Sequence, residues 1–297
     1  MPDNRLTARS TPTQPATAVR VAGEVIGGPA FAVIAGPCSV EGRDMLLKSA
    51  ASVRASGARF LRGGAFKPRT SPYAFRGLGR AALEMLAEAR DVSGLPIVTE
   101  LMDARDIDAV DAVADVIQIG ARNMQNFSLL AAVGERTTPV LLKRGLSATV
   151  HELLLAAEHV MAQGNTQVIL CERGIRTFET STRNTLDISA VPVLKQETHL
   201  PVIVDPSHAA GRADLVPALA AAAVAVGADG LIVEVHPDPV NALSDGAQSL
   251  TFDAFDGMMR TIAALAVICG RSLEIPVSGP LHAFEENGSP SALRVCA

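Results

Sequence analysis

Eight short apolar segments constrain the fold of this chain more than any other feature of its sequence. They are rich in Val, Ile and Leu without strict alternation, which is typical of parallel strands buried on both faces. Successive segments begin about 20 to 38 residues apart, which leaves room for a crossover helix between them. The candidate strands are residues 31–35, 58–61, 96–99, 115–119, 140–142, 167–170, 201–204 and 230–233.

Helical patterns lie between these strands, for example at 44–56, 80–93, 104–113, 149–163, 189–197 and 214–226. Eight strand–helix units predict an α/β fold of the closed (β/α)8 type, the TIM barrel, which typically takes about 250 residues. An open, doubly wound sheet is the alternative that the same pattern allows. We expect an N-terminal extension at 1–30 that is partly disordered, the barrel at 31–268, and a C-terminal tail at 269–297 without a clear period.

Charge and cysteine usage narrow the functional classes. The formal net charge is −5, so neither a general nucleic-acid footprint nor a membrane-surface footprint is indicated. The four cysteines (Cys38, Cys171, Cys269 and Cys296) are too few and too scattered for a disulfide framework, which favours the reducing cytoplasm. Residues 1–30 lack a continuous apolar stretch, and the longest apolar run, 215–226, is too short to span a membrane.

Residues that can do chemistry stand at the carboxyl end of every candidate strand. Active sites of (β/α)8 barrels are built at that end, from the strand termini and the loops that follow them. The sequence therefore predicts an active site on this rim. The residues in chain order are Cys38, Arg62, Glu100, Arg122, Lys143 with Arg144, Arg173, His208 and Glu234.

The loop after the second strand, residues 61–73, has the composition of an anion-binding segment. Its two glycines let the backbone approach a ligand closely, and its two prolines lower the entropy cost of ordering the loop. Arginine and lysine suit phosphate and carboxylate oxygens. A sugar phosphate or phosphoenolpyruvate would fit such a loop, whereas the alternative is a solvated surface loop. Its polar residues are Arg62, Lys67, Arg69, Thr70 and Ser71.

Four of the candidate residues form a possible metal-ligand set: Cys38, His208, Glu234 and, in the following loop, Asp245. A thiolate, an imidazole and two carboxylates suit Mn²⁺, Fe²⁺, Co²⁺ or Zn²⁺, and the two oxygen ligands favour a catalytic site over a closed structural zinc. Closure of a barrel makes its first, seventh and eighth strands neighbours. The alternatives are a buried, apolar role for Cys38 and a turn-stabilising role for His208.

Seven cations would converge on the same rim, and they would repel one another unless an anionic ligand lay among them. They are Arg62, Lys67, Arg69, Arg122, Lys143, Arg144 and Arg173. Some of them can instead point outward and pair with acids, and we expect this first of Arg144. Glu100 can hold a water or accept a proton beside the cations, or it can form a simple ion pair with one of them.

Seven short motifs together closely resemble 3-deoxy-D-arabino-heptulosonate 7-phosphate (DAHP) synthase of the type Iβ branch, over about residues 31–265. They are IAGPCS at 34–39, FKPRTS at 66–71, QIGARN at 118–123, LKRG at 142–145, CERG at 171–174, DPSH at 205–208 and EVH at 234–236. The resemblance implies a transferase that condenses phosphoenolpyruvate with erythrose 4-phosphate and water and releases phosphate, as the first step of the shikimate pathway.

The resemblance also implies roles for individual residues. The metal ligands would be Cys38, His208, Glu234 and Asp245, and the metal is expected to be Mn²⁺, with Co²⁺, Fe²⁺ or Zn²⁺ as possibilities. Phosphoenolpyruvate would be held by Arg62, Lys67, Gly120, Ala121, Arg122, Lys143 and Arg173. The aldose phosphate would be held by Arg69 and Thr70, with Ser71 close by. Lys67 and Glu100 would assist the chemistry beside the metal site of Cys38 and His208, and a homo-oligomer, a dimer or tetramer, is expected.

Two competing functions remain open at this point. The related 3-deoxy-D-manno-octulosonate 8-phosphate synthases use arabinose 5-phosphate, but they typically carry an Ala-Asn-Arg segment where this chain has Lys67-Pro68-Arg69. A catalytically silent barrel that acts as a partner protein is the second alternative. Type Iβ enzymes often carry an additional regulatory domain before the barrel. Because only residues 1–30 precede the first strand here, we expect little inhibition by Phe, Tyr, prephenate or chorismate.

Overall fold

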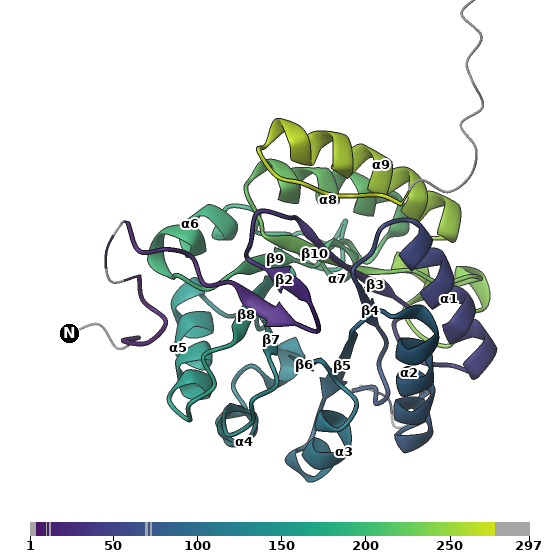
Figure 1. Cartoon of the computed structure of the whole chain (residues 1–297), viewed down its shortest axis with the longest axis horizontal. Helices are drawn as coiled ribbons and strands as arrows, with labels where there is room; N and C mark the ends of the chain where they lie inside the picture. The colour runs from purple at the N-terminus through teal and green to yellow at the C-terminus, as the bar shows by residue number, and fades with distance from the viewer. Residues whose placement is uncertain (1–3, 10, 12, 69–70, 72, 277–297) are drawn as a thin grey trace, which may run out of the picture.

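Eight parallel strands close into a barrel, in the computed structural model that describes residues 4–9, 11, 13–68, 71 and 73–276 (Figure 1). The order around the barrel is β10-β3-β4-β5-β6-β7-β8-β9, so the strands follow chain order and the ring closes between β10 and β3. This confirms the predicted (β/α)8 barrel, and the open sheet is wrong. The strands are β3 (Ala32–Gly36), β4 (Phe60–Arg62), β5 (Ile97–Leu101), β6 (Val116–Ile119), β7 (Val140–Lys143), β8 (Val168–Glu172), β9 (Val202–Val204) and β10 (Gly230–Glu234).

Helices surround the strands. They are α1 (Arg43–Ala55), α2 (Arg80–Ser93), α3 (Ile107–Asp111), α4 (Phe127–Gly134), α5 (Val150–Met161), α6 (Ala190–Glu197), α8 (Val216–Ala225) and α9 (Phe252–Ile268), with the short α7 (Pro206–Ala210) at the end of β9. The expected helix at 104–113 is a 3-10 turn, Ala104–Asp106, followed by α3. Helices α4 and α9 were not among the examples named from the sequence. Helix α4 spans only two turns, and Asn126 caps it by accepting a hydrogen bond from the backbone N–H of Leu129.

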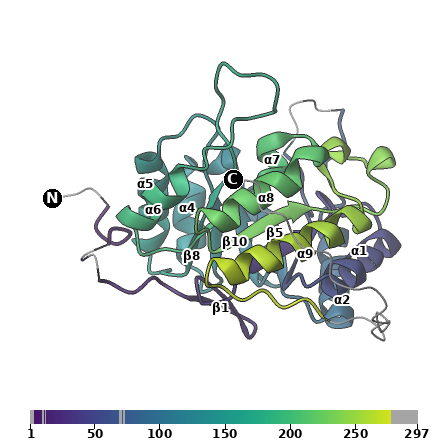
Figure 2. The ribbon, with the colours of Figure 1, turned by 90° about the horizontal axis from the view of Figure 1, so that it is seen from above.

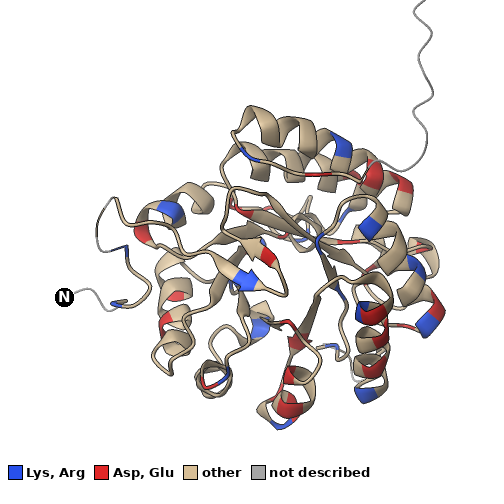
Figure 3. Cartoon of the chain, viewed as in Figure 1, with Lys and Arg blue, Asp and Glu red and all other residues tan. Residues whose placement is uncertain are grey.

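Charged residues of both signs lie on several of the outer helices (Figure 3). Examples are the pair between Arg43 on α1 and Glu88 on α2, and the pair between Arg260 and Asp256 on α9. Within the described ranges, no helix is both long enough and apolar enough to cross a membrane.

A β-hairpin covers the amino end of the barrel. Strands β1 (Val19–Val21) and β2 (Glu24–Ile26) pair antiparallel through a turn in which Ala22 and Gly23 both have positive φ, as a tight two-residue hairpin requires. Val19, Val21 and Ile26 join the apolar cluster inside the barrel, which includes Ile34 and Phe60. In Figure 2 the hairpin lies on one side of the barrel, and the segment between β8 and α6 extends from the other. This hairpin was not predicted from the sequence.

We expect Ile26→Ala to lower the free energy of unfolding by about 2–4 kcal/mol. The Ile26 side chain is fully buried, and truncating it leaves a cavity at the amino end of the barrel. Urea unfolding followed by circular dichroism measures the change. The neighbouring Val25 is half-buried, so Val25→Ala is the matched control and should cost less. An equal loss of unfolding free energy in the two variants would contradict the conclusion that the hairpin closes the amino end of the barrel through Ile26.

Candidate active site and metal centre

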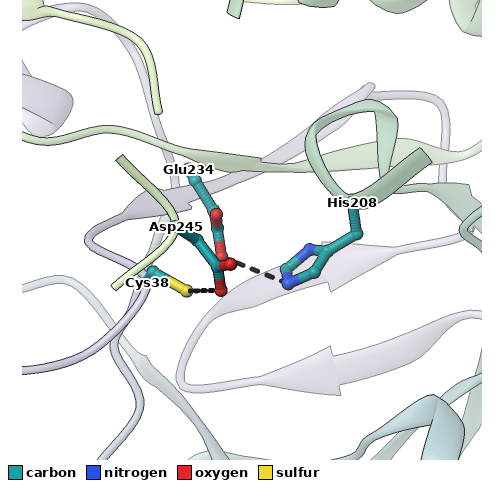
Figure 4. A group of neighbouring side chains, drawn as sticks. All are labelled: Cys38, His208, Glu234 and Asp245. Carbon is teal, nitrogen blue, oxygen red and sulfur yellow. Dashed lines mark hydrogen bonds and ion pairs between the residues drawn. The ribbon is translucent and has the colours of Figure 1, made fainter. Parts of the chain in front are cut away.

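Four side chains from distant parts of the sequence meet at the carboxyl end of the barrel (Figure 4). They are Cys38, His208, Glu234 and Asp245, and each offers a ligand atom within 4.8 Å of the others. Cys38 follows β3, His208 lies on α7 after β9, Glu234 ends β10, and Asp245 lies in the next loop. Since β9, β10 and β3 are neighbours in the barrel, its closure brings these residues together, as the sequence predicted.

Local backbone features place two of these side chains. Gly36 ends β3 with φ of 149°, and a Cβ there would lie 2.2 Å from the carbonyl oxygen of Arg62, so only glycine allows β3 to approach β4 this closely before Cys38. Asp205 and Pro206 begin α7, and the Asp205 side chain accepts a hydrogen bond from the backbone N–H of His208. This cap fixes the turn that carries the imidazole.

Neighbouring carboxylates orient the imidazole of His208. Its Nδ1 lies 2.7 Å from Oδ2 of Asp205, and its Nε2 lies 3.3 Å from Oε1 of Glu234. Asp205 also accepts a hydrogen bond from Nζ of Lys143, at 2.5 Å. Burial alone would raise the pKa of Asp205, but His208 and Lys143 hold it well below its usual range. A carboxylate behind one ring nitrogen is the usual support of a metal-binding histidine, and it leaves Nε2 directed at the other three ligands.

The thiol of Cys38 contacts a cation and an acid. Its Sγ donates a hydrogen bond to Oδ2 of Asp245, at 2.9 Å, and accepts one from Nζ of Lys67, at 2.5 Å. Burial raises the pKa of the Cys38 thiol, and Glu234 adds to this effect while Lys67 opposes it. Burial would also raise the pKa of Asp245, but Lys67 and the Cys38 hydrogen bond lower it far below its usual range. The pair is therefore a thiol beside a carboxylate, and a metal would displace the thiol proton.

Glu234 is ionised despite being buried. Arg62 donates a hydrogen bond to Oε1 of Glu234 through Nη1, and Gln248 donates one to Oε2 through Nε2, both at 2.7 Å. Burial alone would raise the pKa of Glu234, but His208, Arg62 and Lys67 together lower it to about 2. The cluster thus offers one sulfur, one nitrogen and two carboxylates, a donor set that fits a catalytic divalent ion such as Mn²⁺, Fe²⁺, Co²⁺ or Zn²⁺.

A cavity of about 430 Å³ opens beside the four ligands. His208 and Asp245 line it, whereas Cys38, Glu234 and Arg62 are buried and do not line it. The other expected residues that line it are Lys67, Ser71, Glu100, Gly120, Ala121, Arg122, Lys143 and Arg173. Arg69 and Thr70 lie outside the described residues.

One cation of the cavity has a buried donor atom that lacks a hydrogen-bond partner among the described residues. Arg173 is only 5 % exposed, and its Nη1 has no hydrogen-bond partner within the described part of the chain. Burial lowers the pKa of this guanidinium. A buried, unsatisfied donor is costly, and an anion bound in the cavity beside Arg173 would satisfy it.

Arg144 does not belong to the cavity. It donates hydrogen bonds through Nη1 to Glu172, at 2.8 Å, and to Asp187, at 2.9 Å, and through Nε to the carbonyl oxygen of Ala148. The expectation that Arg144 pairs with acids was right, but its side chain is buried rather than directed outward. Because Glu172 ends β8 and Asp187 ends the following loop, this network ties the loop to the barrel.

Several residues that line the cavity were not predicted from the sequence, among them Gln118, Leu146, Arg176, Arg183 and Asn184. Gln118 lies on β6 two residues before Gly120, so the inward alternation of Val116, Gln118 and Gly120 was a usable signal. Arg176, Arg183 and Asn184 come from the irregular segment between β8 and α6, where no period indicates which side chains turn inward.

Comparison with known proteins decides the family. Residues 13–268 match the sequence model of the DAHP synthetase I family. The chain belongs to this family. It is 57% identical, over 82% of its length and 72% of the relative's, to the phospho-2-dehydro-3-deoxyheptonate aldolase of Thermotoga maritima. It is 34% identical, over 79% of its length and 87% of the relative's, to a 2-dehydro-3-deoxyphosphooctonate aldolase of a Bradyrhizobium species.

Solved structures of the DAHP synthetase I family share the whole barrel. The crystal structure of the Thermotoga maritima DAHP synthase superposes with a TM-score of 0.88 at 53% identity, over 91% of this chain and 78% of that one. A truncated form of 3-deoxy-D-arabino-heptulosonate 7-phosphate synthase from the same organism superposes with a TM-score of 0.86 at 49% identity, over 92% of this chain and 100% of that one.

Proposed function

We propose that the cavity joins phosphoenolpyruvate to erythrose 4-phosphate with addition of water, giving 3-deoxy-D-arabino-heptulosonate 7-phosphate and phosphate. This is the first step of the shikimate pathway, and it makes the chain a transferase. The observation that carries the proposal is that four possible metal ligands lie beside a cavity lined by several cations. The 57% identity to the Thermotoga maritima enzyme supports the same reaction.

The cations give the cavity its substrate-binding role. Arg122, Lys143 and Arg173, with the backbone of Gly120 and Ala121, would hold phosphoenolpyruvate, and buried Arg62 and Lys67 would balance its carboxylate. Arg69, Thr70 and Ser71 would hold the phosphate of the aldose. Fixed cations stabilise the transition state because they require no reorganisation as charge moves to the departing phosphate.

The metal ligands would be Cys38, His208, Glu234 and Asp245, and we propose Mn²⁺, with Co²⁺, Fe²⁺ and Zn²⁺ compatible with the same donors. When bound, such an ion acts as a Lewis acid on the aldehyde oxygen of the acceptor. Lys67 and Glu100 would orient the water that adds to phosphoenolpyruvate and would move its proton. Glu100 faces the cavity and accepts a hydrogen bond from Nε2 of Gln118, at 3.3 Å.

Phosphate release with both substrates, before and after treatment with EDTA, tests this function. We expect turnover to be lost with EDTA and restored by added Mn²⁺.

Replacing erythrose 4-phosphate by arabinose 5-phosphate tests the alternative acceptor, which the lower identity to 2-dehydro-3-deoxyphosphooctonate aldolases does not favour. We expect kcat/KM to be at least about tenfold higher with erythrose 4-phosphate. A preference for the pentose phosphate, or no turnover with either, would overturn the assignment. The second outcome would revive the catalytically silent barrel.

Gly120→Ala tests the role of Glu100. A Cβ at position 120 would lie 2.0 Å from Oε1 of Glu100, so the carboxylate must move, while the fold survives because the end of a side chain can shift. We expect kcat to fall at least about tenfold, the lower range for loss of a positioned acid or base. Gly257→Ala, on α9 with open space around it, is the matched control and should be neutral. A Gly120→Ala enzyme with wild-type kcat would exclude this role of Glu100.

The cell compartment and the oligomeric state of the enzyme can also be inferred. We propose a reducing compartment such as the cytoplasm, in which the thiol of Cys38 would stay available as a metal ligand. We also propose a homo-oligomer, a dimer or tetramer. The exposed apolar side chains of Val92 on α2 and of Val267 and Ile268 on α9 support it, and light scattering after gel filtration measures it.

A further inference from the structure

The loop between β10 and α9 holds one metal-ligand candidate in a left-handed backbone conformation. Asp245 has φ of 52°, a conformation that is uncommon for residues other than glycine, although Asp adopts it more readily than most. Its carboxylate nevertheless reaches the thiol of Cys38, in the loop after β3, at 2.9 Å (Figure 4). Contacts outside the four ligands also connect this loop to the loop after β3.

Two buried hydroxyls join the loops directly beside the ligands. Ser39 follows Cys38 and Ser244 precedes Asp245, and their Oγ atoms lie 2.6 Å apart, within hydrogen-bond distance. Ser39 is fully buried and Ser244 is 3 % exposed, so water does not compete for this bond. Breaking it would leave a buried hydroxyl unsatisfied, which is costly.

Glu41 supplies a second connection between the same loops. Its Oε1 accepts a hydrogen bond from the backbone N–H of Leu243, at 2.9 Å, and its Oε2 lies 3.4 Å from Nε2 of His236. His236 begins the loop, and its backbone N–H donates to the carbonyl oxygen of Leu250 at the loop's end. One carboxylate from the loop after β3 thus contacts the β10 loop both at its start and just before Asp245.

We propose that Ser39, Glu41 and Ser244 form a clamp whose role is to hold Asp245 against Cys38 and so to preorganise the metal site. The inference rests on the proposed metal-binding function. None of the three residues lines the cavity, so they are positioning residues rather than catalytic ones. Groups that orient metal ligands typically change metal affinity by about 10–100-fold when they are lost.

Metal titration of Ser244→Ala and Glu41→Ala tests the clamp. Metal-stripped protein is titrated with Co²⁺ by calorimetry, and the sulfur-to-cobalt charge-transfer absorption reports whether Cys38 remains a ligand. We expect each variant to bind Co²⁺ about 10–100-fold more weakly than the wild type. Glu41→Gln keeps an oxygen for the Leu243 N–H and should recover part of the loss. It also serves as the second variant if Glu41→Ala fails to fold. Glu88→Ala, which removes an exposed carboxylate that pairs with Arg43 on the outer helices, should bind as the wild type does.

The outcomes separate a positioning role from a general structural one. Weaker binding with a changed cobalt spectrum, at a melting temperature of the metal-free protein close to that of the wild type, supports the clamp. A lowered melting temperature with unchanged affinity and spectrum would show that these contacts only stabilise the loop, and it would overturn the proposal, as would no change in any property. If the wild type bound no Co²⁺ at all, the metal-binding function itself would fail, which is a distinct result.

Discussion

Cys38→Ala abolishes metal-dependent turnover, lowering kcat by at least about a thousandfold, if the cluster at the barrel rim is the metal site. Lewis-acid polarisation of a carbonyl contributes several kcal/mol, and about 4 kcal/mol corresponds to this factor. The substitution should leave the fold intact, because the thiol makes its hydrogen bonds to Lys67 and Asp245 rather than acting as a core contact. Phosphate release at saturating substrates, with added Mn²⁺, measures the loss.

Cys269→Ala is the control for the general effect of removing a thiol, since Cys269 is an exposed free cysteine at the end of α9. It should keep wild-type activity. A folded Cys38→Ala protein that turns over at near-normal rate would refute the metal assignment. Measuring bound metal in both variants then distinguishes a lost ligand from a damaged active site.

Arg173→Met should separate stability from substrate binding. We expect KM for phosphoenolpyruvate to rise about 100-fold, since truncating one partner of a buried, charged hydrogen bond costs about 2–5 kcal/mol. Stability of the free protein should stay equal or rise, because a buried guanidinium with an unsatisfied Nη1 is exchanged for an apolar side chain of similar length. Steady-state kinetics and thermal melts, each with and without phosphoenolpyruvate, measure both effects.

Arg176→Met is the matched control, because Arg176 lines the same cavity from the same loop but is exposed. It should raise KM far less. If Arg173→Met lowered the melting temperature by several degrees and left KM unchanged, Arg173 would be a structural residue and the anion site would lie elsewhere. In the wild type, phosphoenolpyruvate should raise the melting temperature, and this increase should vanish in Arg173→Met.

Most of what the sequence could predict came from the hydrophobic pattern of the strands and from the residues at their carboxyl ends. The barrel follows from eight buried segments whose observed bounds differ from the predicted ones by at most two residues at either end. Cys38, His208 and Glu234 could be placed together because a closed ring fixes which strand ends are neighbours. The roles of the site residues, in contrast, came from the resemblance and remain predictions.

Irregular segments explain what was missed. Arg183 donates hydrogen bonds to Asp245 and Gln248, yet it lies in a loop where side-chain direction depends on tertiary contacts such as the network of Arg144, Glu172 and Asp187. The β1–β2 hairpin consists of two three-residue strands, too short for alternation to stand out from chance. The local sequence indicates neither the direction of the Arg183 side chain nor the pairing of β1 with β2, because both arise from tertiary packing.

Val19, Val21 and Ile26 fill the amino end of the barrel with apolar side chains. The two ends of the barrel therefore differ in which substitutions they tolerate. Because these side chains fill the amino end, we expect reactants and products to pass through the carboxyl end, where the cavity lies. Substitutions at the amino end are then expected to change stability, and substitutions in the loops at the carboxyl end are expected to change substrate preference and product release. A search for thermotolerant variants would begin at residues 19–26, and a search for new acceptors would leave them untouched.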